Sequence, residues 1–174
     1  MKILIRYVLL LLVFVAITNG QNTPAVNVLL SSTPIVFSSK YSVANSSTNF
    51  LITTPSGSTS TVAKAGATTQ SVTVFALPAK AMVLSCVVKS TTAFTGTTTL
   101  VATLGITGTL TACISTPFDL MAAVSNTNFS VALPAPIVSY AGTNLILALT
   151  STVQNISSIS AGAVDVTITW QILP

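Results

Sequence analysis

Histidine and glutamate are absent from this chain of 174 residues, and only 5% of its residues are charged. Without them the chain can build no Ser–His–Asp triad, no Cys–His pair, no His-ligated zinc site and no Glu general base. Six Lys and Arg against two Asp give a formal charge of +4. The composition therefore argues against an enzyme, and we expect no catalytic residue, no cofactor and no metal.

Positive charge is scattered as well as scarce. After residue 20 the only cations are four lysines, which lie far apart in the sequence: Lys40, Lys64, Lys80 and Lys89. Nucleic-acid binding by phosphate neutralisation needs clustered cations. We therefore do not expect a nucleic-acid partner.

Residues 1–20 have the pattern of a secretory signal peptide. Lys2 and Arg6 precede the apolar run Tyr7–Ile17, which is followed by a short polar stretch ending in Gly20. Eleven helical residues span about 17 Å, well short of the roughly 30 Å hydrocarbon layer. Cleavage after Gly20 would leave residues 21–174. The alternative is an uncleaved N-terminal membrane anchor, so membrane contact is expected only through residues 1–20.

Residues 21–174 are predicted to form one domain of β-strands, because apolar and polar residues alternate. The alternation is clearest at 165–172, where Val166, Ile168, Trp170 and Ile172 share one face; it recurs at 145–149 and at Met82, Leu84, Cys86 and Val88. Shorter runs lie at 25–30, 34–38, 49–53, 71–76, 99–104, 109–115 and 129–133, and turn signals lie at 55–57, 95–97, 105–108, 141–143 and 161–162. This spacing indicates an antiparallel β-sandwich or barrel with Trp170 in its core.

Hydroxyl side chains account for the polar positions, since the chain holds 28 Thr and 21 Ser. The branched Cβ of threonine favours a strand, and its hydroxyl hydrates an outward face without charge. Charged side chains are a usual guard against association of sheets. Their scarcity predicts assembly with copies of the chain or with other proteins.

Residues 38–70, rich in Ser, Thr, Asn and Gly, are predicted to be a long hairpin and loop of the same domain.

Few residues are candidates for a site. Cys86 and Cys113 are the only cysteines, and in an exported chain they predict a disulfide worth about 3–4 kcal/mol, with two buried thiols as the alternative. Asp119 and Asp165 are the only carboxylates and lie in unlike contexts, so neither an acid–base pair nor a metal site is expected; Asp165 is expected to be exposed or to cap a turn. Three sequons place candidate N-glycosylation at Asn45, Asn128 and Asn155. Tyr41 and Tyr140 lie near turn signals and are candidate exposed contact residues.

Two stretches resemble recurrent phrases of β-sandwich, jelly-roll-like virion proteins of phages. One is Val87–Gly96 followed by Leu104–Gly108, and the other is Ile159–Trp170. The likeness covers residues 71–174 and implies a structural or attachment role with no catalytic residue. An export signal is unusual in tailed phages and fits a membrane-containing virus or a cell-surface protein of similar fold.

The sequence thus predicts a non-enzymatic, exported subunit with a single antiparallel, jelly-roll-like β-sandwich. We expect it outside the cell or on a virion surface after Sec-type export, as part of a virion or cell-surface coat. Its expected partners are copies of itself or other coat or surface proteins. The alternative is a secreted adhesin or carbohydrate-binding module that uses residues 38–70 or the turn bearing Tyr140.

Overall fold

A computed structural model describes residues 35–122, 128–130, 137–139 and 141–173. Strands dominate this part of the chain: β1 (Val36–Asn45), β2 (Asn49–Thr53), β3 (Thr59–Ala63), β4 (Thr69–Leu77), β5 (Ala81–Thr95), β6 (Val101–Ile106), β7 (Thr109–Asp119), β8 (Asn128–Ser130), β9 (Ile137–Ser139), β10 (Thr143–Thr150) and β11 (Ala161–Ile172). The 3₁₀-helix η1 (Ile156–Ser158) is short, and no helix among these residues could cross a membrane. The predicted signal segment 1–20 and the strand predicted at 25–30 lie outside the described residues.

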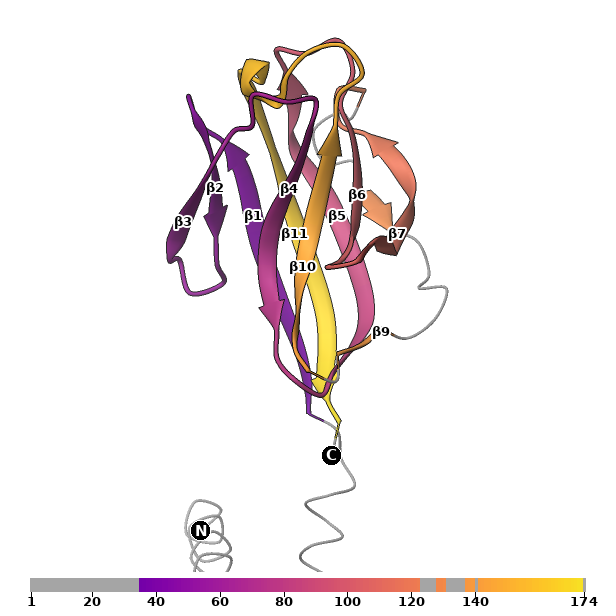
Figure 1. Cartoon of the computed structure of the whole chain (residues 1–174). Helices are drawn as coiled ribbons and strands as arrows, with labels where there is room; N and C mark the ends of the chain where they lie inside the picture. The colour runs from indigo at the N-terminus through magenta and orange to yellow at the C-terminus, as the bar shows by residue number, and fades with distance from the viewer. Residues whose placement is uncertain (1–34, 123–127, 131–136, 140, 174) are drawn as a thin grey trace, which may run out of the picture. The chain divides into compact units, whose positions relative to one another are not determined.

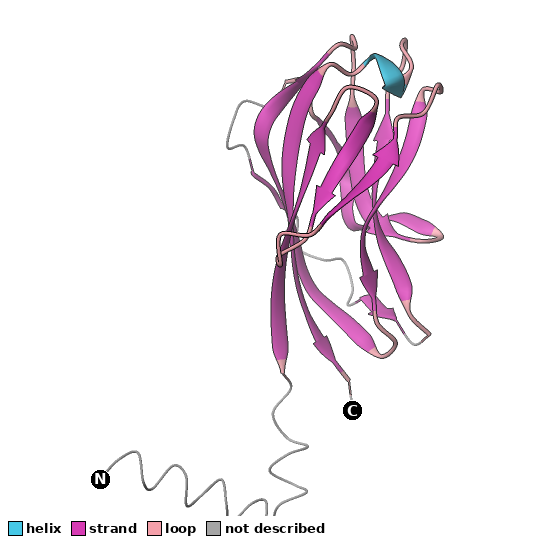
Figure 2. Cartoon of the chain, turned by 90° about the vertical axis from the view of Figure 1, so that its left-hand side faces the viewer, coloured by secondary structure: helices cyan, strands magenta, loops and turns pink. Residues whose placement is uncertain are grey.

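The strands form two antiparallel sheets (Figure 1). The larger sheet has the order β3-β2-β1-β11-β5-β8, and β9 also pairs with β5; the smaller has the order β4-β10-β6-β7. Figure 2 shows the strands in two layers, and the buried side chains of both sheets form one hydrophobic cluster. The all-β, antiparallel prediction is therefore confirmed, and the two layers pack as in a β-sandwich.

Alternation along β11 divides its residues between the core and the outer surface. Val164, Val166 and Ile168 are fully buried, and Trp170 is 9% exposed. Trp170 stacks on Phe37 of β1, with 4.5 Å between ring centroids, and also contacts Phe75 of β4. The core position predicted for Trp170 is confirmed.

Strand β5 does not follow the face predicted for Met82 and Leu84. Its pairing with β11 changes register between Thr169 and Trp170, where Ser85 lies opposite Thr169 and Val83 opposite Trp170. Leu84 is the extra residue of this bulge, and it is exposed, whereas Val83 and Cys86 are buried. A bulge shifts the inward positions of a strand by one residue. The prediction of one shared face for 82–88 is therefore wrong at Met82 and Leu84.

The turn predicted at 161–162 is also wrong, because Ala161 and Gly162 belong to β11. Gly162 has φ of 132°, a region that side-chain-bearing residues rarely adopt, and the ring of Phe94 from β5 occupies the space where a Cβ would lie. This glycine marks a register shift beside Ala163 within the strand. The turns at 55–57, 95–97, 105–108 and 141–143 each hold a glycine of positive φ.

Residues 38–70 contain most of β1, the β2–β3 hairpin and the connection to β4. Strand β2 has the bounds predicted at 49–53, and its Phe50 and Ile52 are buried. Part of the predicted loop is strand β3, which pairs along its length with β2. The hairpin therefore extends the larger sheet beyond β1.

Candidate interaction surfaces

The outer face of the smaller sheet is almost uncharged. Strands β4, β10 and β6 contain no charged residue, and β7 contains only Asp119. The register places outward positions side by side across these strands: Ser71, Thr73, Thr103, Ile146 and Ala148. Ile146 is 8% exposed although its position in the register is on this face. The result is a surface of hydroxyl and aliphatic groups.

The outer face of the larger sheet carries one ion pair. Nζ of Lys40 on β1 lies 3.1 Å from Oδ2 of Asp165 on β11, with side-chain exposures of 65% and 16%. Lys89 of β5 lies directly opposite Asp165 in the register. Asp165 is thus flanked by strands that each carry a lysine and is neither a turn cap nor fully exposed, which corrects the prediction for this residue.

Lys64 joins three segments at the end of the larger sheet where β1 ends and β11 begins. Its Nζ donates to Oδ1 of Asn45, at 3.0 Å, and to the backbone oxygen of Ile159, at 2.6 Å. Burial lowers the pKa of Lys64 below its ordinary value. The side chain therefore holds the end of β1, the β3–β4 connection and the start of β11 together.

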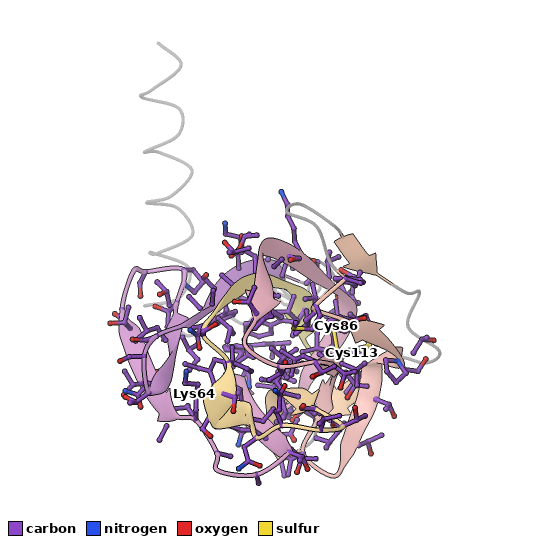
Figure 3. All side chains as sticks on the ribbon, turned by 90° about the horizontal axis from the view of Figure 1, so that it is seen from above. Lys64, Cys86 and Cys113 are labelled. Atoms are coloured by element: carbon purple, nitrogen blue, oxygen red, sulfur yellow. A yellow bond between two sulfur atoms is a disulfide. The ribbon has the colours of Figure 1, made fainter. Side chains whose placement is uncertain are left out.

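Cys86 of β5 and Cys113 of β7 are both buried, and the structure joins them by a disulfide, seen in Figure 3. Their Cα atoms lie 5.8 Å apart, within the ordinary range for such a bond. Since β5 and β7 belong to different sheets, the bond links the two layers.

The two carboxylates, Asp119 and Asp165, belong to strands of different sheets. Asp119 lies at the end of β7, where Oδ1 accepts hydrogen bonds from the backbone N–H groups of Met121, at 2.8 Å, and Ala122, at 3.3 Å. Asp165 lies on β11 of the other sheet. In the described part of the chain no three residues of the kinds that bind metals lie close together.

The three sequons differ in their surroundings. Asn45 is half-buried, and its side-chain oxygen accepts the hydrogen bond from Lys64. Asn155 is exposed and precedes η1 without a side-chain capping bond. The backbone of Asn128 in β8 pairs with Lys89 of β5, and the side chain of Asn128 is not among those described. Asn155 is therefore the more accessible of the two sequons whose side chains are described.

Tyr41 is not an exposed contact residue, and that prediction is wrong. It lies on the inward face of β1, is 6% exposed and contacts the ring of Phe75, with 5.2 Å between centroids. Burial raises the pKa of its phenol, and a hydrogen bond with Ser39 partly offsets this. Tyr140 lies outside the described residues. A shallow depression of about 430 Å³ is lined by Ala76, Leu77, Thr107, Gly142, Thr143 and Asn144.

Comparisons with known proteins give one structural likeness. No family model matches the chain, and no curated protein is similar to it in sequence. A solved structure titled "Cyanophage Pam1 capsid asymmetric unit" is similar, with 22% identity over 82% of this chain and 88% of the other and a TM-score of 0.49. This structure comes from a phage capsid, and the two sequence phrases resemble phage virion proteins. At this level of similarity, function has to be argued from the chain's own residues.

Sequence reasoning missed two features of these surfaces. The role of Lys64 depends on Asn45 and Ile159, which lie far from it in the sequence and carry no shared motif. The uncharged outer face of the smaller sheet was readable in part, because residues 69–77, 101–106 and 143–150 contain no charge. What the sequence does not give is that these three runs lie side by side.

Proposed function

We propose that the chain is a non-enzymatic, exported structural subunit of a virion or cell-surface coat, which assembles with its own copies or with other coat proteins. The uncharged outer face of the smaller sheet is the observation that carries this proposal. Flat sheet surfaces and edges without charge favour association, and soluble monomers usually protect them with charged groups. The absence of His and Glu supports a role in contact rather than catalysis.

The strand order supports a jelly roll as the finer description of this sandwich. Without the β2–β3 hairpin, and with β8 and β9 counted as one strand, eight strands remain in chain order. They pair first with last (β1 with β11), second with seventh (β4 with β10), third with sixth (β5 with β8 and β9) and fourth with fifth (β6 with β7). Such nested pairs form one long hairpin. Pairing of β11 with β5 and of β10 with β6 rolls it into two sheets, which is the jelly-roll arrangement used by viral capsid and lectin domains.

A carbohydrate-binding module remains the second candidate, because the depression near Gly142 is lined by Thr107, Thr143 and Asn144, whose polar groups suit a sugar. Burial of Tyr41 removes one of the two aromatic residues on which that hypothesis depended. A glycan array distinguishes the two proposals. Binding that is lost in Asn144→Ala would favour the module, and no binding would favour the coat subunit.

Size-exclusion chromatography with light scattering, over a concentration series of the full-length chain, tests assembly. We expect a mass that rises with concentration. Ala148→Lys should weaken association, because it places a charge in the middle of the uncharged face. Ser157→Lys adds the same charge on exposed η1 and should have little effect. A monomer at every concentration, with no partner recovered by cross-linking from the producing cells, would contradict the proposal.

A further inference from the structure

Strand β3 is an open edge of the larger sheet. It is the outermost strand at that side of the sheet, beyond β2 (Figure 1). Its five residues, Thr59–Ala63, contain no charge, no proline and no bulge against β2. Unpaired N–H and C=O groups on such an edge are a template for another strand.

The direction of each backbone group in β3 follows from the hydrogen bonds that flank it. Thr54 N–H donates to the oxygen of Ser58, at 2.9 Å, and Lys64 N–H donates to the oxygen of Thr48, also at 2.9 Å. Backbone groups of successive strand residues alternate in direction, so Ser60 and Val62 also face β2. The backbone groups of Thr59, Thr61 and Ala63 therefore point away from the sheet.

One outward acceptor already has a partner within the chain. Nε2 of Gln70 donates to the oxygen of Ala63, at 2.6 Å, and the same amide accepts from Ala65 N–H, at 2.9 Å. These bonds agree with the outward direction deduced for the odd-numbered residues. The other outward groups are the N–H and C=O of Thr59 and Thr61 and the N–H of Ala63. The described part of the chain supplies no hydrogen-bond partner for them.

The other sheet edges are interrupted. Strand β7 contains Pro117 and two changes of register against β6. Strand β4 is bulged near Thr73, and β8 and β9 have only three residues each. Proline, bulges and short strands are known ways to block edge pairing. Among the described strands, β3 is thus the edge with the least protection.

The nearest positive charge does not guard this edge. Lys64, labelled in Figure 3, follows β3 directly. Its Nζ donates hydrogen bonds to Oδ1 of Asn45 and to the backbone oxygen of Ile159, which hold it away from the edge. Along Thr59–Ala63, a second β3 strand would meet neither charge nor proline. This neutrality is what distinguishes a second copy of the chain from a charged peptide as the occupant.

Resting on the proposed function, we propose that β3 pairs antiparallel with β3 of a second copy about a two-fold axis at Thr61. This register sets Thr61 opposite Thr61 and Thr59 opposite Ala63 of the second copy. The two Thr61 residues would exchange hydrogen bonds, and each Ala63 N–H would donate to the Thr59 oxygen of the other copy, while the Ala63 oxygen keeps its bond to Gln70. Strand addition of this kind joins two sheets through main-chain hydrogen bonds. The paired hairpins would extend the larger sheet continuously across both copies.

Thr61→Pro tests the edge without breaking the hairpin, because the Thr61 N–H is not used in pairing with β2. We expect it to raise the concentration needed for half-association about tenfold, through loss of the two central hydrogen bonds. Thr61→Lys provides a second variant, since two lysines would lie directly opposite each other. Ser157→Lys is the matched charge control and should associate like the wild type.

Mixing Thr61→Lys with Thr61→Asp tests the register. Opposite charges at the two-fold axis should restore association to the mixture, while each variant alone stays weak. If the wild type associates and all Thr61 variants associate equally well, pairing through β3 is wrong while the proposed coat function stands. A wild-type chain that is monomeric at all concentrations would overturn both.

Discussion

Cys86 and Cys113 connect the two sheets across the core, with 5.8 Å between their Cα atoms. They are separated by 27 positions that include most of β5, all of β6 and part of β7. The chain has no other cysteine, so this is its only disulfide, and hydrophobic contacts hold the layers together elsewhere.

Loss of the Cys86–Cys113 bond should lower the free energy of unfolding by about 3–4 kcal/mol, because a closed loop of this length restricts the unfolded chain. Urea denaturation with and without reductant measures the effect. The double variant Cys86→Ala/Cys113→Ala should be insensitive to reductant. Intact mass should show the native protein lighter by two hydrogen atoms than its reduced form. Equal masses and equal unfolding midpoints would contradict the bond.

Replacement of Gly162 by alanine should destabilise the protein by about 2–4 kcal/mol. The new Cβ would overlap the ring of Phe94, and a φ of 132° is unfavourable for alanine. Thermal or urea unfolding measures the loss.

Gly57 and Gly66 allow the effect of overlap with a neighbouring side chain to be separated from the effect of an unfavourable φ. Gly57 has φ of 84° but nothing within 4 Å of its added Cβ, so Gly57→Ala should cost about 1 kcal/mol from backbone strain alone. Gly66 has neither feature, and Gly66→Ala should change stability by less than about 0.5 kcal/mol. Equal effects at all three positions would refute this account of Gly162.

Lys64 and Lys40 should differ in their contributions to stability. Lys64→Met keeps the aliphatic stem but removes two hydrogen bonds from a partly buried position, and should cost about 1–2 kcal/mol. Lys40→Met removes an ion pair whose lysine is largely exposed, and should cost less than about 0.5 kcal/mol. Chemical denaturation of both variants gives the comparison, and the reverse order would show that the Lys64 contacts contribute little.

Stability at alkaline pH should depend on Tyr41. Its pKa is raised above the ordinary 10.0 in the folded protein, so the folded state keeps a proton that the unfolded state loses. The stability from this group is complete below about pH 10 and falls as the pH rises through the raised value. Tyr41→Phe should therefore lose less stability than the wild type when the pH is raised above about 10.

The pKa of Lys64 is shifted in the opposite direction, so its contribution to stability changes with pH in the opposite sense and serves as a check. Its pKa is lowered from 10.5, so the unfolded state binds the proton more strongly and stability from this group rises as the pH passes through the lowered value. Lys64→Met should make the alkaline loss steeper, and Tyr41→Phe should make it shallower. Unfolding curves measured from about pH 9 to 11 test both, and identical pH profiles for the three proteins would contradict the assignment.

The sequence predicted the strands well where local alternation determines burial. In β11 the inward series from Val164 to Trp170 follows directly from a period of two. It failed at Leu84 because the bulge in β5 is set by pairing with β11, which lies far away in the chain. Gly162 was mistaken for a turn residue for the same reason, since the ring of Phe94 that requires it comes from another strand.

The candidate surfaces were less predictable than the strands. Composition indicated uncharged outer faces, but only the strand order brings β4, β10 and β6 together into one such face. Tyr41 was misassigned because its inward phase with Val43 becomes evident only once β1 is known to extend through both residues. Lys64 had no sequence signal, because both of its partners are supplied by distant connections.

The central place of β11 in the larger sheet has a consequence for how the protein is made. As the last strand described, it supplies the neighbour that both β1 and β5 need. On a ribosome, residues 36–41 of β1 would have no neighbouring strand until β11 had been made, because β2 pairs only with residues 42–45, and contacts so distant in sequence form slowly. A transcript truncated just ahead of Ala161 would yield aggregation-prone fragments rather than a shortened sandwich.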